Sequence, residues 1–124
     1  MAHILIIDDD SQVLEMLKQT FFRANYDVDT ATDGNKAMVI NQQNPADVVI
    51  TDLIMPDKEG MEVIREFRRN FPKTKIIAIS GGGRYSGPID YLDLAHKLGA
   101  ARVFSKPFER KDILQAVKEL LKEE

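Results

Sequence analysis

The sequence predicts an α/β fold in which a five-stranded parallel sheet carries helices on both faces. Short apolar runs alternate strictly with longer amphipathic stretches, which is the pattern of strands and helices in such a sheet. The runs at 4–7 and 76–79 are apolar throughout, as expected for strands buried on both faces. A chain of 124 residues fits one core, so we expect residues 1–124 to form a single domain.

The three other expected strands are more varied in pattern. Residues 48–50 form another continuous apolar run, and residues 102–104 form a weaker one. Residues 28–31 alternate apolar and polar side chains, which is typical of a strand near the edge of a sheet.

Between the strands, five stretches carry apolar residues at helical spacing. A weak one follows Gly34. The stretch from 87 to 98 has Pro88 at its expected first helical position and Gly99 as its expected stop. The three strongest cover residues 13–24, 60–71 and 113–121.

Composition excludes several classes of function. The net charge of −3 gives no overall basic character, and we read the basic residues between 65 and 75 as a solvated helix face rather than a nucleic-acid site. The lack of cysteine excludes disulfides, thiolate metal sites and a cysteine nucleophile, and fits a reducing cytoplasm. We see neither a signal peptide nor an apolar run near the ~18 residues that a membrane span needs.

Polar residues follow four of the expected strands at the point where each ends. The carboxyl ends of parallel strands meet at one rim of the sheet, which is where such folds place their sites. The residues at these ends are Asp8-Asp9-Asp10, Thr51-Asp52, Ser80 and Ser105-Lys106-Pro107.

This set of residues suits phosphoryl chemistry with a hard cation. Clustered carboxylates such as Asp8, Asp9 and Asp52 repel one another unless a cation or a proton offsets the charge. Oxygen ligands and few carboxylates favour Mg²⁺. A carboxylate can attack phosphorus to give an aspartyl phosphate, and that step needs nearby positive charge and a hydroxyl donor, which Lys106 and Ser80 offer.

Each residue also has an ordinary structural explanation. Asp10 is placed to cap the following helix, and an acidic triplet there is commonly a cap with solvated charge. Ser80 could satisfy a strand end, and Lys106 could be a surface lysine. Their coincidence at the ends of four strands favours the functional interpretation.

The chain resembles the receiver domains of two-component response regulators over nearly its whole length. The similar segments are ILIIDDD (4–10), VVITDLIMPDKEGMEVI (48–64), IIAISG (76–81) and LGAARVFSKPF (98–108). The resemblance implies a doubly wound, flavodoxin-like (βα)5 sandwich with strand order 2-1-3-4-5.

The resemblance also implies a role for each residue at the rim. Asp52 would accept the phosphoryl group, the Ser80 hydroxyl would bind its oxygens, and Lys106, followed by a cis peptide to Pro107, would face the acyl phosphate. Mg²⁺ would be held by Asp9 directly, by Asp8 mostly through water, by Asp52 and by the backbone carbonyl of Ile54.

A signalling role rather than turnover of a metabolite follows from the same resemblance. The phosphoryl donor would be a sensor histidine kinase or a histidine phosphotransfer protein. No DNA-binding segment follows the last expected helix, so we expect altered contacts with a downstream protein. We expect a stand-alone monomer or weak homodimer in the cytoplasm, without direct binding to DNA or membranes.

Two features depart from the family pattern. Many receivers carry Tyr or Phe three residues before the lysine, where this chain has Val103; Phe104 points to the opposite face and cannot replace it. The segment between Ser80 and Gly99 is longer than in chemotaxis-type members and begins with three glycines. It is either a tolerated surface insertion or itself the switch, and backbone relaxation with and without a phosphoryl mimic tests the second hypothesis.

Three other functions stay open. The chain could be an interaction module of this fold that no longer uses phosphorylation. It could be a Mg²⁺-dependent phosphohydrolase acting through an aspartyl phosphate, although that class generally has a second Asp where Ile54 stands; turnover of phosphate esters discriminates. A flavin-binding protein would be yellow, and we see no loop built to hold its phosphate.

We expect His3 and His96 at the surface or at a strand edge.

The side chain of Ile54 predicts slow loss of the phosphoryl group. Ile54 lies two residues after Asp52, and an apolar side chain there cannot orient an attacking water by hydrogen bonding. We expect the isolated phosphoprotein to decay more slowly than members with Asn or Asp at this position. Rapid decay, followed by intact mass over time, contradicts this.

Overall fold

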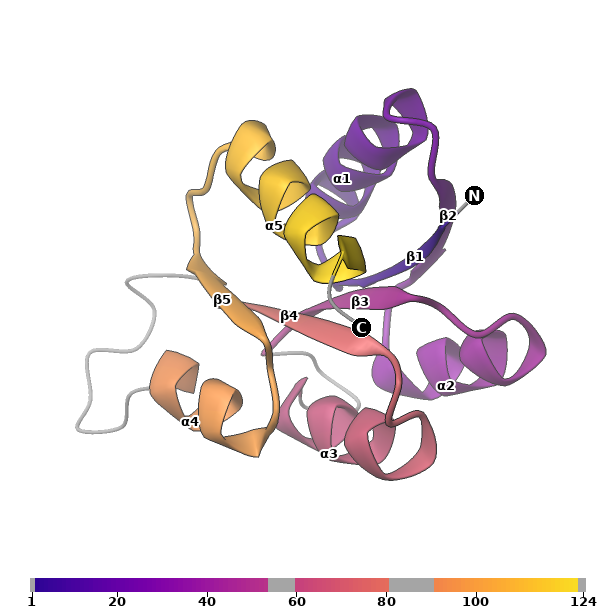
Figure 1. Ribbon diagram of the computed structural model, residues 1–124, viewed down its shortest axis with the longest axis vertical. Helices are drawn as coiled ribbons and strands as arrows, with labels where there is room; N and C mark the ends of the chain where they lie inside the picture. The colour runs from indigo at the N-terminus through magenta and orange to yellow at the C-terminus, as the bar shows by residue number, and fades with distance from the viewer. Residues whose placement is uncertain (1, 54–59, 81–90, 123–124) are drawn as a thin grey trace.

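The computed structural model describes residues 2–53, 60–80 and 91–122, with only the backbone of residues 91 and 92. The described residues form five strands and five helices in strict alternation (Figure 1). The elements are β1 (His3–Ile7), α1 (Ser11–Arg23), β2 (Asp27–Ala31), α2 (Gly34–Gln43), β3 (Val48–Asp52), α3 (Gly60–Asn70), β4 (Lys75–Ser80), α4 (Tyr91–Leu98), β5 (Arg102–Ser105) and α5 (Arg110–Lys122).

The strands form one parallel sheet in the order β2-β1-β3-β4-β5, which confirms the predicted topology. The alternating strand β2 lies at one edge, as its pattern predicts, and β5 lies at the other. The continuous apolar strands β1, β3 and β4 occupy the centre, where side chains on both faces are buried.

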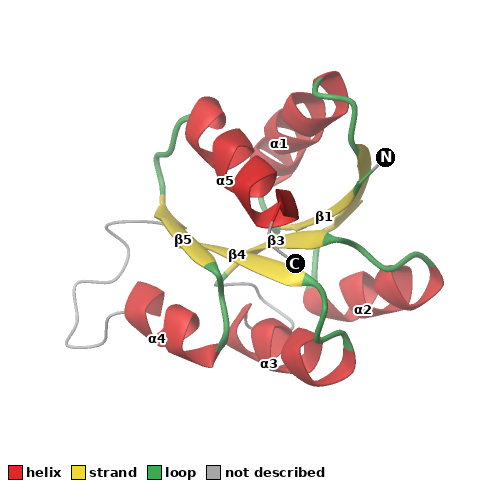
Figure 2. Ribbon diagram, viewed as in Figure 1, coloured by secondary structure: helices red, strands yellow, loops and turns green. Residues whose placement is uncertain are grey.

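Helices cover both faces of the sheet, α1 and α5 on one side and α2, α3 and α4 on the other (Figure 2). Alternate residues of each central strand therefore enter different cores: Ile4 and Ile6 pack with α1 and α5, whereas Leu5 and Ile7 pack with the other three helices. A one-residue shift in register would exchange these two sets between the cores, so the close packing of each core fixes the pairing.

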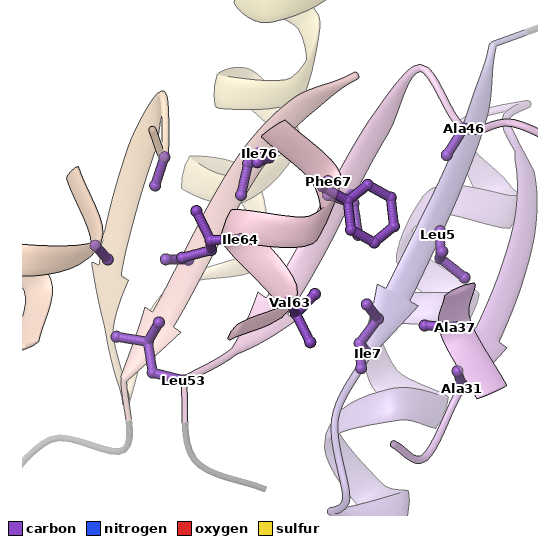
Figure 3. Packing of buried hydrophobic residues seen from close by; sticks show 14 residues of the cluster. Leu5, Ile7, Ala31, Ala37, Ala46, Leu53, Val63, Ile64, Phe67 and Ile76 are labelled. Atoms are coloured by element: carbon purple, nitrogen blue, oxygen red, sulfur yellow. The ribbon is translucent and has the colours of Figure 1, made fainter. Parts of the chain in front are cut away.

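Helix α3 supplies much of the second core. Val63, Ile64 and Phe67 lie on one face of the helix and are fully buried against the sheet. Figure 3 shows these three side chains directed towards the strands that carry Leu5, Ile7 and Ile76. The exposed face carries the basic residues that the sequence places on a solvated surface, including Arg65 and Arg69.

The helix ends follow local sequence rules where the structure describes them. The Asp10 carboxylate accepts hydrogen bonds from the backbone N–H of Gln12 (2.9 Å) and Val13 (3.4 Å), which confirms it as the cap of α1. Gly99 follows α4 with φ +129°, a conformation that favours glycine at a helix stop. The expected start of the fourth helix at Gly87-Pro88 lies outside the described residues.

Neighbouring side chains of β5 face opposite cores, as the sequence predicts. Val103 is half-buried and packs against the core beneath α2, α3 and α4, whereas Phe104 packs against the core beneath α1 and α5. Phe104 also contacts the ring of Phe108, with centroids 6.2 Å apart. Phe104 therefore cannot take the place of an aromatic residue at position 103.

None of the helices in the described ranges is both long and apolar enough to cross a membrane.

His3 corrects the expectation of a surface residue, because its side chain is buried at the start of β1. His3 is only 6% exposed and starts the central strand β1. Its ring Nε2 lies 2.7 Å from an Asp29 carboxylate oxygen, and Nδ1 lies 3.3 Å from the Pro45 carbonyl oxygen. Its backbone N–H donates to Asp47 Oδ2 at 2.8 Å. His3 therefore ties β1 to β2 and to the segment before β3, whereas His96 is exposed as expected.

We predict that His3→Phe lowers the free energy of unfolding by about 1–2 kcal/mol, because it removes two partly buried hydrogen bonds while keeping most of the ring volume. Asp29 is 42% exposed at its side chain and can be hydrated after the change. The midpoint of urea unfolding measures the effect. His96→Phe is the matched control: His96 is exposed, and its ring Nδ1 lies 3.0 Å from the Ala100 carbonyl oxygen, a partner that water can replace. It should therefore lower the free energy of unfolding by less than His3→Phe does; equal effects contradict the prediction.

Candidate functional site

The pairing of β1 with β3 brings two carboxylates side by side at the carboxyl rim of the sheet. Ile7 is in register with Thr51, so the next residues, Asp8 and Asp52, lie on adjacent strands at the same level. Asp8 is 1% exposed and Asp52 is 4% exposed, whereas Asp9 is open to solvent. One carboxylate oxygen from each of the three lies within 4.8 Å of the others. The structure thus assembles the acidic cluster that the sequence predicts.

Lys106 reaches this cluster from the end of β5. Its backbone N–H donates to the Ser80 carbonyl oxygen at 2.8 Å, next to the register pair Ser80 and Ser105. Its ammonium Nζ lies 3.2 Å from Asp8 Oδ2 and 3.7 Å from Asp52 Oδ2. The peptide between Lys106 and Pro107 is cis, as the resemblance implies. A single half-buried cation therefore bridges the two buried carboxylates.

Burial raises the pKa of the Asp8 carboxyl above its ordinary value of 3.8, because the charged form loses hydration. A hydrogen bond from the backbone N–H of Asp10, at 2.9 Å, and the charge of Lys106 oppose this change, while the nearby Asp9 charge adds to it. The net direction shows that one lysine does not fully offset the cost of ionising Asp8. A further positive charge near the cluster would favour the ionised form of Asp8.

Ser80 reaches the same rim from β4. Asp52 is in register with Ile79, so Ser80 lies one residue beyond that pair, at the level where β3 ends. The residue is half-buried. The residues that the sequence predicts for this site therefore lie on one rim, at the carboxyl ends of β1, β3, β4 and β5: Asp8, Asp52, Ser80 and Lys106.

Two residues to which the sequence analysis gave no role, Gly60 and Thr51, lie against the backbone carbonyl of Asp52. Gly60 starts α3 with its backbone N–H donating to Leu53 O at 3.0 Å, and a Cβ atom there would lie 2.2 Å from the Asp52 carbonyl oxygen. Thr51 is fully buried, and its hydroxyl donates to that same oxygen at 3.0 Å. The glycine of the D-L-I-M-P-D-x-x-G segment could have indicated a close approach. The sequence places Thr51 at the rim, but no sequence signal indicates its hydrogen bond to the Asp52 carbonyl.

The donor set fits a hard divalent cation. Asp8, Asp9 and Asp52 offer only oxygen atoms, two of them on buried side chains, which suits Mg²⁺ with part of its water shell retained. The remaining predicted ligand, the carbonyl of Ile54, lies outside the described residues.

Comparison with known proteins gives the family. The model of the response regulator receiver domain matches residues 4–118. A response regulator receiver domain protein from Clostridium thermocellum has 32% identity and a TM-score of 0.87, over 98% of this chain and 94% of that one. The chemotaxis response regulator CheY4 of Vibrio cholerae has 28% identity and a TM-score of 0.84, over 97% and 98%. A CheY-like receiver protein from Methanospirillum hungatei has 26% identity and a TM-score of 0.89, over 98% and 94%.

This chain belongs to the family of response regulator receiver domains. Receiver domains are modules of two-component signalling rather than metabolic enzymes, and they interact with histidine kinases and phosphotransfer proteins. They generally bind Mg²⁺ at a cluster of aspartates, and this chain has such a cluster in Asp8, Asp9 and Asp52.

We predict that Asp8→Asn stabilises the metal-free protein at pH 7. A carboxyl whose pKa is raised by folding binds its proton more tightly in the folded state, so its contribution favours folding at low pH. That contribution is lost as the pH rises from 3.8, the ordinary value, through the raised folded value. The amide removes this loss and keeps an oxygen for the Asp10 N–H.

Urea unfolding between pH 4 and pH 7 checks this prediction. The advantage of the variant should shrink towards pH 4 and should also shrink when Mg²⁺ stabilises the wild type. Asp9→Asn is the matched control, because its side chain is exposed, and should give a smaller gain. A wild type that is more stable than Asp8→Asn at pH 7 without metal contradicts the argument.

Proposed function

We propose that the chain is a phosphorylation-dependent signalling receiver in which Asp52 accepts a phosphoryl group. The observation that carries this proposal is the convergence of Asp8, Asp52 and Lys106, with the Nζ atom of Lys106 within 4 Å of both carboxylates. A buried carboxylate beside a fixed cation is poised to act on an anionic donor whose charge would otherwise repel it.

In the proposed reaction, a carboxylate oxygen of Asp52 attacks the phosphorus of a phosphohistidine in the donor protein. The new P–O bond forms as the P–N bond breaks, and the bonding electrons return to the donor's imidazole, which takes up a proton. The product is an acyl phosphate on Asp52. Lys106 neutralises charge on the transferred group, and the Ser80 hydroxyl donates a hydrogen bond to one of its oxygens.

Mg²⁺ is the cofactor that we propose for this step. Asp8, Asp9, Asp52 and the backbone carbonyl of Ile54 would hold it, Asp8 mostly through water. When bound, the ion supplies positive charge to the phosphoryl oxygens. With the ion bound, a second positive charge would lie beside Asp8, and the Lys106 ammonium would be available to neutralise charge on the phosphoryl group of Asp52.

The proposed donor is a sensor histidine kinase or a histidine phosphotransfer protein, and the proposed output is altered contact with a downstream protein. We propose that residues 1–124 act as one domain in the cytoplasm, without binding DNA. The net charge of −3 and the lack of cysteine support this assignment.

Val103 is the observation that keeps a second function under consideration. Its aliphatic side chain already packs inward against the core beneath α4, so no aromatic ring is available there to move between two positions. An interaction module of this family that works without phosphorylation would need neither the ring nor the acyl phosphate.

We predict that incubation with Mg²⁺ and acetyl phosphate adds one phosphoryl group to the wild type. Intact mass should show a single adduct that disappears with EDTA and in Asp52→Asn, because that variant lacks the nucleophile. Asp93→Asn, a change of an exposed carboxylate on α4, should leave the adduct unchanged. The adduct should form at least about tenfold more slowly in Lys106→Ala, since charge stabilisation of the transferred group is lost.

A wild type that binds Mg²⁺ but shows no adduct, either with acetyl phosphate or with a phosphorylated histidine phosphotransfer protein, contradicts the proposal. That result would favour the module that works without phosphorylation.

A further inference from the structure

A hollow of about 520 Å³ lies between the end of α1 and the start of β2, away from the acidic rim. We call it the α1–β2 hollow. Phe22 forms part of its wall; it is 70% exposed and is the most exposed large apolar side chain among the described residues. The hollow is lined by Lys18, Phe22, Asn25, Tyr26, Asp27 and Val28.

The surroundings of Phe22 are held in place by the core. The preceding residue, Phe21, is fully buried, and its ring contacts that of Tyr26 with centroids 5.8 Å apart. The Tyr26 backbone N–H donates to Phe21 O at 3.1 Å across a turn in which Asn25 has φ +70°. The backbone that carries Phe22 is therefore held in place, and only the two side-chain torsions of the ring have to be ordered when a partner covers it.

The charges beside the hollow suggest what covers it. Lys18 and Phe22 are four residues apart and share one face of α1, while Asp27 starts β2; both charged side chains are exposed. The lining thus holds one cation and one anion, so it favours neither a basic nor an acidic partner. A second copy offers the opposite charge to both side chains, and a two-fold contact is one in which Lys18 of each copy can pair with Asp27 of the other.

We propose that the α1–β2 hollow binds a second copy of this chain about a two-fold axis. Each Phe22 enters the hollow of the other copy, and two Lys18–Asp27 ion pairs flank the rings. Edge pairing of the two β2 strands is not part of this interface, because Asp27 and Asp29 are carboxylates on that edge strand and oppose strand addition.

The position of the hollow separates this contact from phosphorylation. Helix α1 begins after Asp10 and spans 13 residues, which carries Phe22 about 20 Å from the acidic rim. Association through this face therefore leaves Asp52 and Lys106 open to a kinase and should not depend on Mg²⁺ or on an acyl phosphate. A single small hollow predicts a weak dimer, in the class that buries less than about 1,200 Å².

Sedimentation equilibrium of the unphosphorylated protein in EDTA, from about 10 µM to about 2 mM, tests the proposal. We expect a reversible monomer–dimer equilibrium that Phe22→Asp weakens at least about tenfold. Val39→Asp changes another exposed apolar residue, 56% exposed on α2, and should leave the equilibrium unchanged. Urea midpoints of both variants establish that they are folded.

A charge exchange tests the two-fold geometry. Lys18→Glu alone and Asp27→Lys alone should each weaken association, because like charges then face each other across the axis. An equimolar mixture of the two single variants, and the double variant, should associate as the wild type does. A wild type that stays monomeric at 2 mM, a mixture no stronger than its components, or association that requires Mg²⁺ with acetyl phosphate would overturn the proposal.

Discussion

The close approach of two buried carboxylates, Asp8 and Asp52, is the constraint on which the site depends. Parallel pairing of β1 with β3 in one register forces these side chains to the same level of the rim. Two like charges in a poorly hydrated place are unfavourable, and the Lys106 ammonium between them offsets part of the cost. The position of Lys106 in turn depends on β5 pairing with β4. The order of the strands in the sheet therefore determines which charged side chains lie together at the site.

The remaining cost is visible in the raised pKa of Asp8, whose burial outweighs the help from Lys106 and the Asp10 N–H. Stability has to come from elsewhere in the fold. The two apolar cores supply it, because the central strands bury side chains on both faces and pack against five helices. Repulsion between buried carboxylates is sensitive to any charge added beside them. Binding of a cation or transfer of a phosphoryl group would therefore change the energetics of this site.

The two ends of α1 lie at two different surfaces, the acidic rim and the α1–β2 hollow. Its first turn follows the acidic triplet and belongs to the rim, whereas its last turn presents Phe22 beside a charge-balanced hollow. The two proposals together assign phosphoryl transfer to one end of the domain and binding of a second copy to the other. Such an arrangement would bring two acceptor sites into one assembly without coupling their occupancy to assembly.

The sequence by itself determined the alternation of strands and helices, the edge position of β2, the acidic rim and the opposite directions of Val103 and Phe104. These features follow from local periodicity and from the rule that parallel strands end at one rim. Only the tertiary structure decided the burial of His3 between Asp29 and Pro45, the contact of Gly60 with the Asp52 carbonyl and the exposure of Phe22. Each of these depends on how closely separate segments pack, and the periodicity of one segment carries no information about the distance to another.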